Sequence, residues 1–119
     1  MIIGIGLDIV DLIRIEKAAN KQPKFVARVL TAAEKERYDQ LTGNRQIEFL
    51  AGRFAAKEAF AKAYGTGLGQ VSFQDIEILN DAKGKPIVTK SPTDFQTFVS
   101  ITHTGQVAAA QVILEKISE

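Results

Sequence analysis

The 119-residue sequence contains three charged residues whose types and settings suit phosphate chemistry. Asp8 closes the segment Gly4-Ile-Gly-Leu-Asp8, and Glu58 and Lys62 lie one helical turn apart in a later segment. Magnesium in proteins binds one or two carboxylates and keeps its other positions for water and phosphate oxygens. A lysine beside the metal offsets phosphate charge. These three residues therefore predict a magnesium and phosphate site, provided that the fold brings the two segments together.

Glu58 has the most unusual setting of the three, because it falls within an apolar stripe. On a helical wheel of about 100° per residue, its neighbours in the helix predicted over 45–64 are Phe54 and Ala61. An ionised glutamate there costs several kcal/mol unless a cation accompanies it. A salt bridge to Lys62 is one explanation, and the wheel alone favours it. It leaves Asp8 without a role, so the metal site stays an open alternative.

Residues 2–10 alternate in the pattern of a β-strand that carries Asp8. The apolar residues at positions 3, 5, 7 and 9 are expected to face the core, with Gly4, Gly6 and Asp8 on the opposite face. The glycines either leave room for a ligand beside Asp8 or let another element pack close. The pattern does not decide between these two explanations.

The elements that position these residues follow from periodicity and caps. Three helices are expected over 11–20, 32–43 and 45–64, with a further short helical segment over 24–30 after Pro23, and Gly65 stops the last helix. Strands are expected over 71–79, 86–89, 98–103 and 107–115. The whole predicts one α+β domain over 1–119: a strand, three helices, then antiparallel strands, with the long helix packed on the sheet.

Composition narrows the class of protein. The absence of cysteine excludes disulfides and thiolate metal sites and suits a reducing compartment. A net charge of +1 gives no global reason to expect nucleic acid. The N-terminal segment lacks a basic region and so predicts a strand rather than a signal peptide, and no apolar run approaches the roughly 20 residues of a membrane span. We therefore expect a cytoplasmic protein that binds neither nucleic acid nor membranes.

Four sequence blocks, in this order, are similar to those of a known family. They are Gly4-Ile-Gly-Leu-Asp8-Ile-Val10, Phe25-Val-Ala-Arg28-Val-Leu-Thr31-Ala-Ala-Glu34, Arg53-Phe-Ala-Ala-Lys57-Glu58-Ala-Phe-Ala-Lys62-Ala and Ser100-Ile-Thr-His103-Thr104. Together they resemble the holo-[acyl-carrier-protein] synthases, the short bacterial type of 4'-phosphopantetheinyl transferase. The likeness spans almost the whole chain, and the first and third blocks at this separation are its most specific part.

The resemblance implies a reaction. Coenzyme A would donate its 4'-phosphopantetheine group to a serine of apo-acyl carrier protein for fatty acid biosynthesis, leaving adenosine 3',5'-bisphosphate. The family's magnesium ligands fall on Asp8 and Glu58, and its catalytic lysine falls on Lys62. Glu58, directly or through a metal-bound water, is our candidate for accepting the serine proton. The resemblance also implies a homotrimer with an active site at each subunit interface.

Several further residues are expected to contact coenzyme A. His103 is the only histidine, and a lone histidine is more often structural, but the resemblance favours Ser100, His103 and Thr104 as contacts from a neighbouring subunit. Arg53 and Lys57 share one helix edge and suit a coenzyme that carries a 3'-phosphate, with Arg45 and Lys85 as lesser candidates.

Three further expected contacts lie in turn regions. Gly65 and Gly67 follow the long helix and are expected near the pantetheine and phosphate, although no Walker loop is present because no Gly-Lys-Ser/Thr follows. Pro86 is expected near the adenine by resemblance alone.

The N-terminal helical region is rich in basic residues, which by default form a solvated face. The resemblance instead indicates a docking surface for the acidic acyl carrier protein, made by Arg14, Lys24, Phe25 and Arg28. Phe25, apolar among charges, is the expected interface anchor.

Two rival functions use the same residues differently. A magnesium-dependent nucleotide phosphohydrolase would keep the carboxylates but act with water. A non-catalytic module would bind RNA or an acidic protein through the basic segment, with Glu58 and Lys62 as a plain salt bridge. The weak net charge and the lack of interleaved aromatic residues argue against RNA.

Overall fold

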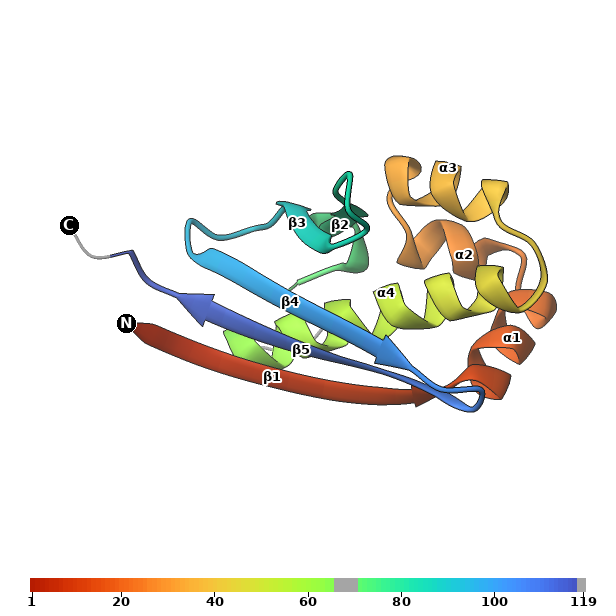
Figure 1. Cartoon of the computed structure of the whole chain (residues 1–119), viewed down its shortest axis with the longest axis horizontal. Helices are drawn as coiled ribbons and strands as arrows, with labels where there is room; N and C mark the ends of the chain where they lie inside the picture. The colour runs from red at the N-terminus through yellow and green to blue at the C-terminus, as the bar shows by residue number, and fades with distance from the viewer. Residues whose placement is uncertain (66–70, 118–119) are drawn as a thin grey trace.

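In the part of the chain that the structure describes, residues 1–65 and 71–117 of a computed structural model, one strand precedes four helices and four further strands. The N-terminal elements are β1 (Ile2–Asp11), α1 (Leu12–Lys21), α2 (Lys24–Val29), α3 (Ala32–Gln40) and α4 (Gly43–Tyr64). A 3-10 turn, η2 (Phe73–Asp75), leads into β2 (Glu77–Asn80), β3 (Pro86–Lys90), β4 (Gln96–His103) and β5 (Val107–Glu115). The helices α1–α3 gather around one end of α4 (Figure 1). The predicted α+β class, with the long helix on an antiparallel sheet, is confirmed.

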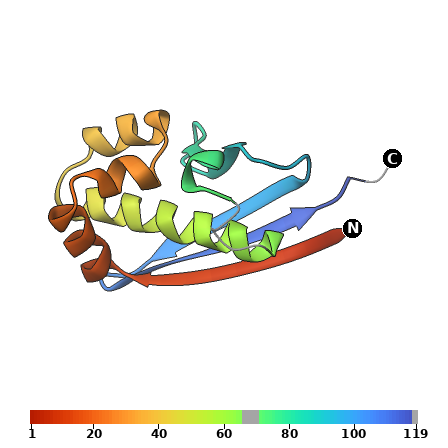
Figure 2. The same cartoon turned by 180° about the vertical axis from the view of Figure 1, so that it is seen from behind.

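The strands form one three-stranded antiparallel sheet and one separate two-stranded ribbon. The sheet has the order β1-β5-β4, and the ribbon pairs β2 with β3. The pairing of β1 with β5 runs from Ile2 opposite Glu115 to Asp11 opposite Val107. Strands β4 and β5 form the expected hairpin, with His103 opposite Ala108. The long helix α4 runs along β1 and β5 (Figure 2).

The glycine face of β1 packs directly against α4. A Cβ atom added at Gly4 would collide with the carbonyl oxygen of Ala63, and one added at Gly6 would collide with that of Ala59. Glycine is therefore required for the strand and helix backbones to approach this closely. The close-packing explanation of the two glycines is confirmed, and the space around them is filled by α4 rather than left for a ligand.

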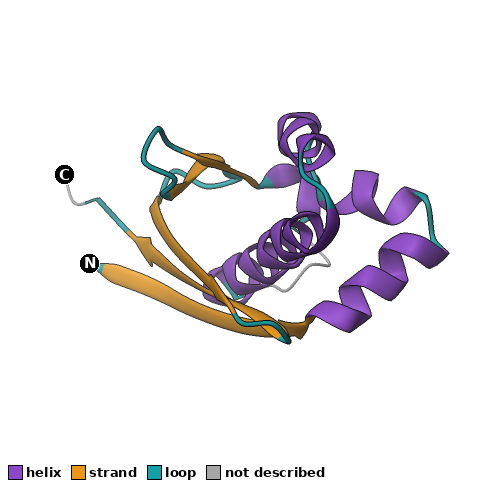
Figure 3. Cartoon of the chain, turned by 45° about the vertical axis from the view of Figure 1, so that its right-hand side comes forward, coloured by secondary structure: helices purple, strands orange, loops and turns teal. Residues whose placement is uncertain are grey.

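The apolar face of β1 does not face the core, which corrects the sequence-based expectation. Exposed fractions are 60% at Ile5, 63% at Leu7 and 67% at Ile9, and Phe98 of β4 on the same face is 46% exposed. The described helices all lie on the other side of the sheet (Figure 3). Alternation shows which residues share a face, but it does not show which face the rest of the chain covers.

The ends of several elements differ from their predicted positions. The third helix begins at the capping box formed by Thr31 and Glu34, as expected, but ends at Gln40 rather than near Gly43. The strand predicted over 71–79 is only Glu77–Asn80, because the Ser72 hydroxyl accepts from the Gln74 N–H and begins a 3-10 turn. Gly65, with φ of 93°, ends α4 as predicted. Of the described helices, none has the length and apolar character needed to cross a membrane.

Candidate active site

The fold brings Asp8 of β1 next to the C-terminal half of α4. Oδ1 of Asp8 accepts a hydrogen bond from Nζ of Lys62 at 2.9 Å, and the same amine donates to the carbonyl oxygen of Leu7 at 3.0 Å. The Asp8 side chain is 15% exposed and that of Lys62 is 53% exposed. The close contact between β1 and α4 that Gly4 and Gly6 permit is what places these groups within reach of each other.

Glu58 does not form the salt bridge that the helical wheel favoured. Within the described residues, the carboxylate that pairs with Lys62 is Asp8, and no pair within 4.0 Å joins Lys62 to Glu58. Burial, and next the negative charge of Asp8, raise the pKa of Glu58, while Lys62 acts in the opposite direction. Glu58 is thus a half-buried carboxyl group beside a second carboxylate, a setting that favours an added cation.

Asp8 and Glu58 open into one cavity of about 340 Å³. Its wall also includes Arg14 of α1, Phe25 of α2 and Phe54 of α4. The rings of Phe25 and Phe54 stack with centroids 6.1 Å apart, so α2 forms part of the cavity wall. The cavity therefore combines two carboxylates with an exposed arginine and an apolar side.

The donor set of this cavity fits magnesium that is shared with a phosphate. No group of three or more histidine, aspartate or glutamate side chains suited to a metal occurs among residues 1–65 and 71–117. The negative charge of Asp8 contributes to the raised pKa of Glu58, and two carboxylates leave most metal positions for water and phosphate oxygens, which is the pattern magnesium adopts in phosphate-transfer sites. Asp8 and Glu58 are thus the residues that would hold it.

Phe25, the predicted interface anchor, is nearly buried in the single chain. It is 8% exposed and packs in the core, with its ring facing Phe54. Arg28 covers it, with Cζ lying 5.7 Å from the ring centroid, and Arg14, Lys24 and Arg28 are exposed. The basic residues predicted to dock the carrier protein are therefore exposed, whereas Phe25, the apolar residue predicted with them, forms part of the cavity wall.

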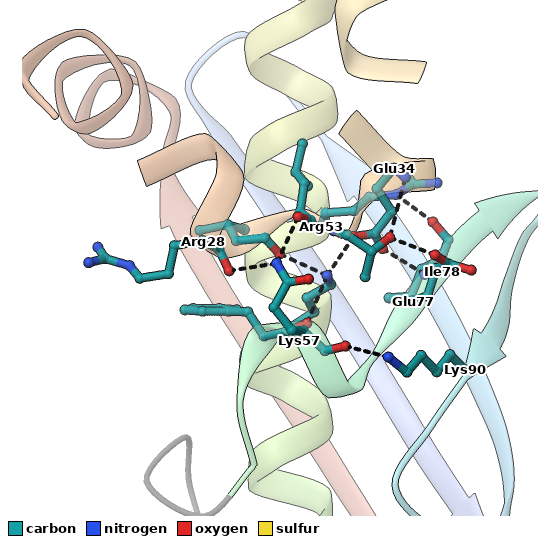
Figure 4. Close-up of polar contacts among 12 residues, drawn as sticks. Arg28, Glu34, Arg53, Lys57, Glu77, Ile78 and Lys90 are labelled. Atoms are coloured by element: carbon teal, nitrogen blue, oxygen red, sulfur yellow. Dashed lines mark hydrogen bonds and ion pairs between the residues drawn. The ribbon is translucent and has the colours of Figure 1, made fainter. Parts of the chain in front are cut away.

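Arg53 and Lys57 of α4 are both expected to contact coenzyme A. For Lys57 the structure corrects this expectation, because its side chain is fully buried. The residue has 0% exposure, and Nζ donates to the carbonyl oxygens of Val29 at 2.8 Å and Phe73 at 3.0 Å. The third donor goes to Oε1 of Glu34 at 2.5 Å (Figure 4). Because an ammonium group has three donors, none is left for a ligand.

Glu34 is the buried partner of Lys57, which the sequence did not single out as a charged core residue. It is fully buried, and its carboxylate accepts from Lys57, from the Thr31 N–H at 2.8 Å and from the Ile78 N–H at 2.7 Å. The capping box identified Glu34 as the start of a helix. Its partner lies 23 residues away, so local pattern gave no sign of a buried ion pair.

Arg53 shares the helix edge with Lys57 but lies at the wall of two cavities. Nε donates to the Ile78 carbonyl at 3.1 Å, and Nη2 donates to Oδ1 of Asn80 at 3.1 Å. Burial lowers the pKa of Arg53 to about 10, so the guanidinium remains charged at neutral pH. It borders a cavity of about 510 Å³ beside α3 and one of about 220 Å³ beside β4.

The smaller of these two cavities is strongly basic. Arg37, Arg45, Arg53 and His103 line it together with Glu48, whose carboxylate lies 3.7 Å from Nδ1 of His103. This cavity is beside β4, whereas the carboxylate cavity is beside β1, and β5 separates the two strands. Asp8 and His103 therefore belong to different sites within one chain.

The remaining predicted coenzyme A residues are dispersed in the structure. Ser100 alternates with Ile101 and so lies on the outer sheet face with Phe98. Thr104 caps the β4–β5 turn, where its hydroxyl accepts from the N–H groups of Gln106 and Val107. Pro86 begins β3 and Gly65 ends α4, while Gly67 lies outside the described residues.

Comparisons with a family model, with related sequences and with solved structures agree on one family. The model of the 4'-phosphopantetheinyl transferase superfamily matches residues 4–113. The chain is 58% identical over 120 residues to holo-[acyl-carrier-protein] synthase of Bacillus velezensis, covering 99% of both chains, and 53% identical over 116 residues to that of Streptococcus thermophilus, covering 98% of both. A crystal structure of a holo-(acyl-carrier-protein) synthase from Bacillus anthracis in complex with CoA (3',5'-ADP) superposes with a TM-score of 0.92, at 51% identity, covering 98% of this chain and 99% of that one.

The fold, the paired carboxylates and these matches define the class: the chain belongs to the 4'-phosphopantetheinyl transferase superfamily. Within that superfamily it belongs with the holo-[acyl-carrier-protein] synthases, which it matches over nearly its full length.

Proposed function

We propose that this chain transfers 4'-phosphopantetheine from coenzyme A to a serine of apo-acyl carrier protein in a magnesium-dependent reaction. The observation that carries the proposal is the convergence of Asp8 and Glu58, from β1 and α4, on one cavity beside Lys62. The exposed cations Arg14, Lys24 and Arg28 lie on α1 and α2, two helices that contribute to the cavity wall, and suit an acidic protein substrate.

The chain's own residues account for most of the chemistry. The serine oxygen attacks the β-phosphorus of coenzyme A, the bond to the 3',5'-bisphosphate leaving group breaks, and the serine proton passes to Glu58. The half-buried position of Glu58 in the cavity wall supports this role, because it places a carboxylate within the cavity where the serine would react. Lys62 is exposed enough to turn from Asp8 toward phosphate oxygens. Asp8 and Glu58 would hold the magnesium ion, which would neutralise charge on the pyrophosphate.

The complete site requires a second subunit. The carboxylate cavity and the basic cavity lie beside opposite edge strands of one sheet, so in the proposed assembly one coenzyme A molecule would contact the carboxylate cavity of one chain and the basic cavity of its neighbour. The 3'-phosphate suits the arginines and His103 of the basic cavity. The exposed apolar face of β1 and β4 provides the surface for such an assembly, and a homotrimer agrees with the family resemblance.

One assay separates the proposal from its rivals. The protein is incubated with coenzyme A, magnesium and an apo-carrier protein, and the carrier is weighed by mass spectrometry. A gain of one phosphopantetheine supports the transferase. Hydrolysis of coenzyme A without carrier indicates a phosphohydrolase, and carrier binding without reaction indicates a non-catalytic module.

The role of Glu58 as the base has its own test. In Glu58→Gln, turnover is expected to fall by about 10²-fold or more at saturating magnesium. Near-normal turnover with magnesium still bound would show that the base is another group.

The biological setting extends the same proposal. A holo-carrier protein made by this reaction supports fatty acid biosynthesis. The cytoplasmic location that we propose is compatible with the absence of cysteine from the sequence.

A further inference from the structure

The C-terminal end of α2 is held by side chains from two other elements. The last four carbonyls of a helix lack partners within it, and here they belong to residues 27–30. Nε2 of Gln74 lies 2.9, 3.2 and 2.8 Å from the carbonyl oxygens of Ala27, Arg28 and Leu30. Nζ of Lys57 donates to the remaining one, that of Val29, at 2.8 Å. All four carbonyls are thus satisfied, with the two amide hydrogens of Gln74 shared among three acceptors.

The hydrogen bonds at the C-terminal end of α2 connect the docking cations, the cavity wall and Glu58. Helix α2 carries the exposed cations Lys24 and Arg28, and through Phe25 it forms a wall of the cavity that holds Glu58. Lys57 precedes Glu58 directly on α4, and it also binds the carbonyl oxygen of Phe73, next to Gln74. In Figure 4 the Arg28 side chain points away from the buried cluster, although its backbone faces it. The position of α2 therefore determines both the docking charges and the cavity wall.

We propose that Gln74 and Lys57 are positioning residues that hold α2 at a fixed place relative to Glu58, so that a docked carrier protein presents its serine to the cavity. The proposal rests on the proposed function, because it concerns the use of α2 by the protein substrate. Gln74 is not among the residues that line the cavity of Asp8 and Glu58. It acts through α2 alone.

Gln74 can be changed without dismantling the fold. It is exposed, and the η2 turn around it depends on backbone groups and on Ser72 and Asp75 rather than on the Gln74 side chain. Lys57 is unsuitable for the same test, because its removal leaves the buried Glu34 carboxylate without its cation. The experiment therefore varies Gln74.

Two matched pairs of variants separate hydrogen-bond donation from charge. Gln74→Glu keeps the shape of the side chain but removes its donors, and Gln74→Lys restores a donor. Gln22, exposed between α1 and α2, provides the controls Gln22→Glu and Gln22→Lys, which change charge by the same amount beside the same basic surface. KM for apo-carrier protein, KM for coenzyme A, kcat and the midpoint of thermal unfolding are measured for all four variants and the unmodified chain.

The expected result is a selective loss. KM for the carrier rises about fivefold in Gln74→Glu relative to Gln22→Glu, which equals about 1 kcal/mol at 1.4 kcal/mol per tenfold. Gln74→Lys stays within about twofold of Gln22→Lys, because a donor again faces the carbonyls. KM for coenzyme A changes by less than about twofold in every variant, since none of the residues expected to bind the coenzyme lies on α2.

Two outcomes overturn the proposal. Equal carrier KM values for Gln74→Glu and Gln22→Glu would mean that Gln74 does not set the docking position. A parallel loss for both substrates, with a lowered unfolding midpoint, would mean that the contact serves only the fold. Failure of the proposed function is recognised separately, because the unmodified chain would then transfer no phosphopantetheine at all.

Discussion

Two adjacent residues on α4, Lys57 and Glu58, have opposite electrostatic settings. Lys57 is fully buried and neutralised by Glu34, whereas Glu58 is half-buried and lies beside another carboxylate. The first arrangement is complete within the chain and holds α2, α3 and η2 to α4. The second is incomplete without a cation, and this contrast distinguishes a structural ion pair from a candidate site.

The raised pKa of Glu58 predicts a pH-dependent stability. The folded chain holds this proton more tightly than the unfolded chain, whose glutamate titrates near 4.5. The stabilising contribution is therefore present below that pH and is lost as the pH rises through the higher folded pKa. In metal-free buffer, Glu58→Gln should melt at a higher temperature than the unmodified chain at pH 7, with the difference shrinking toward pH 4. Thermal melts followed by circular dichroism test this, and a pH-independent difference would contradict it.

The Lys57–Glu34 pair predicts a large loss of stability when one partner is removed. Lys57→Met leaves a carboxylate with 0% exposure unpaired, so the free energy of unfolding should fall by about 3–5 kcal/mol. Lys35→Met removes an exposed pair with Asp39 at 2.9 Å and should change it by less than about 1 kcal/mol. Urea unfolding at one protein concentration measures both, and similar losses in the two variants would argue against a structural role for the buried pair.

At the scale of elements, the contact between β1 and α4 determines the site. Strand β1 approaches α4 over Gly4 and Gly6, and this places Asp8 beside Lys62. The sequence indicated both elements and the shared face of Gly4, Gly6 and Asp8. It could not indicate that this face was the buried one, because alternation is symmetric between the two faces of a strand.

The glycine contact predicts a position-specific effect of one methyl group. Gly6→Ala places a Cβ against the backbone carbonyl of Ala59, which cannot move aside as a side chain can, and should cost about 3 kcal/mol of unfolding free energy. Gly105→Ala, with no atom within 4 Å of the added Cβ, should change it by less than about 0.5 kcal/mol. Because Asp8 lies two residues beyond Gly6, magnesium binding measured by calorimetry should weaken only in Gly6→Ala. Equal behaviour of the two variants would contradict the close contact.

Most of the predicted helices and strands are present in the structure. The contacts between residues far apart in the chain could not be predicted from the sequence. Capping by Thr31 and Glu34 and the stop at Gly65 are local signals, and both are confirmed. The burial of Lys57 and Phe25 depends on carbonyls and rings from other elements, which no local pattern encodes. The charged sequence neighbours of Phe25 favour a role at an interface. They do not indicate that its ring packs against Phe54.

At the scale of the whole molecule, the uncovered apolar face is the most informative feature. Ile5, Leu7, Ile9 and Phe98 expose a continuous surface on the outer side of the sheet. A surface of this kind, together with two separated ligand cavities, fits a subunit that completes its site by association.

The uncovered face predicts that one charge prevents assembly without unfolding the chain. Leu7→Glu places a carboxylate at the centre of that face, where its side chain is 63% exposed in the single chain. We expect monomers in sedimentation analysis, an unchanged circular dichroism spectrum and at least about 10²-fold lower transfer activity. Lys83→Glu, in the exposed β2–β3 turn, serves as the control and should remain assembled. Full activity in a monomeric Leu7→Glu variant would show that one chain suffices.

The pairing of β1 with β5 also dictates the order in which the molecule can be made. The first strand of the chain hydrogen-bonds along its length to the last, and Met1 and Lys116 close the ladder with bonds of 3.1 and 2.8 Å. During synthesis, β1 must wait for nearly all other residues before its partner leaves the ribosome. Contacts between such distant segments slow folding and expose the nascent strand to aggregation. Helix α4 is synthesised before β5. It can pack against β1 at Gly4 and Gly6, and so bury one face of β1 before β5 pairs with it.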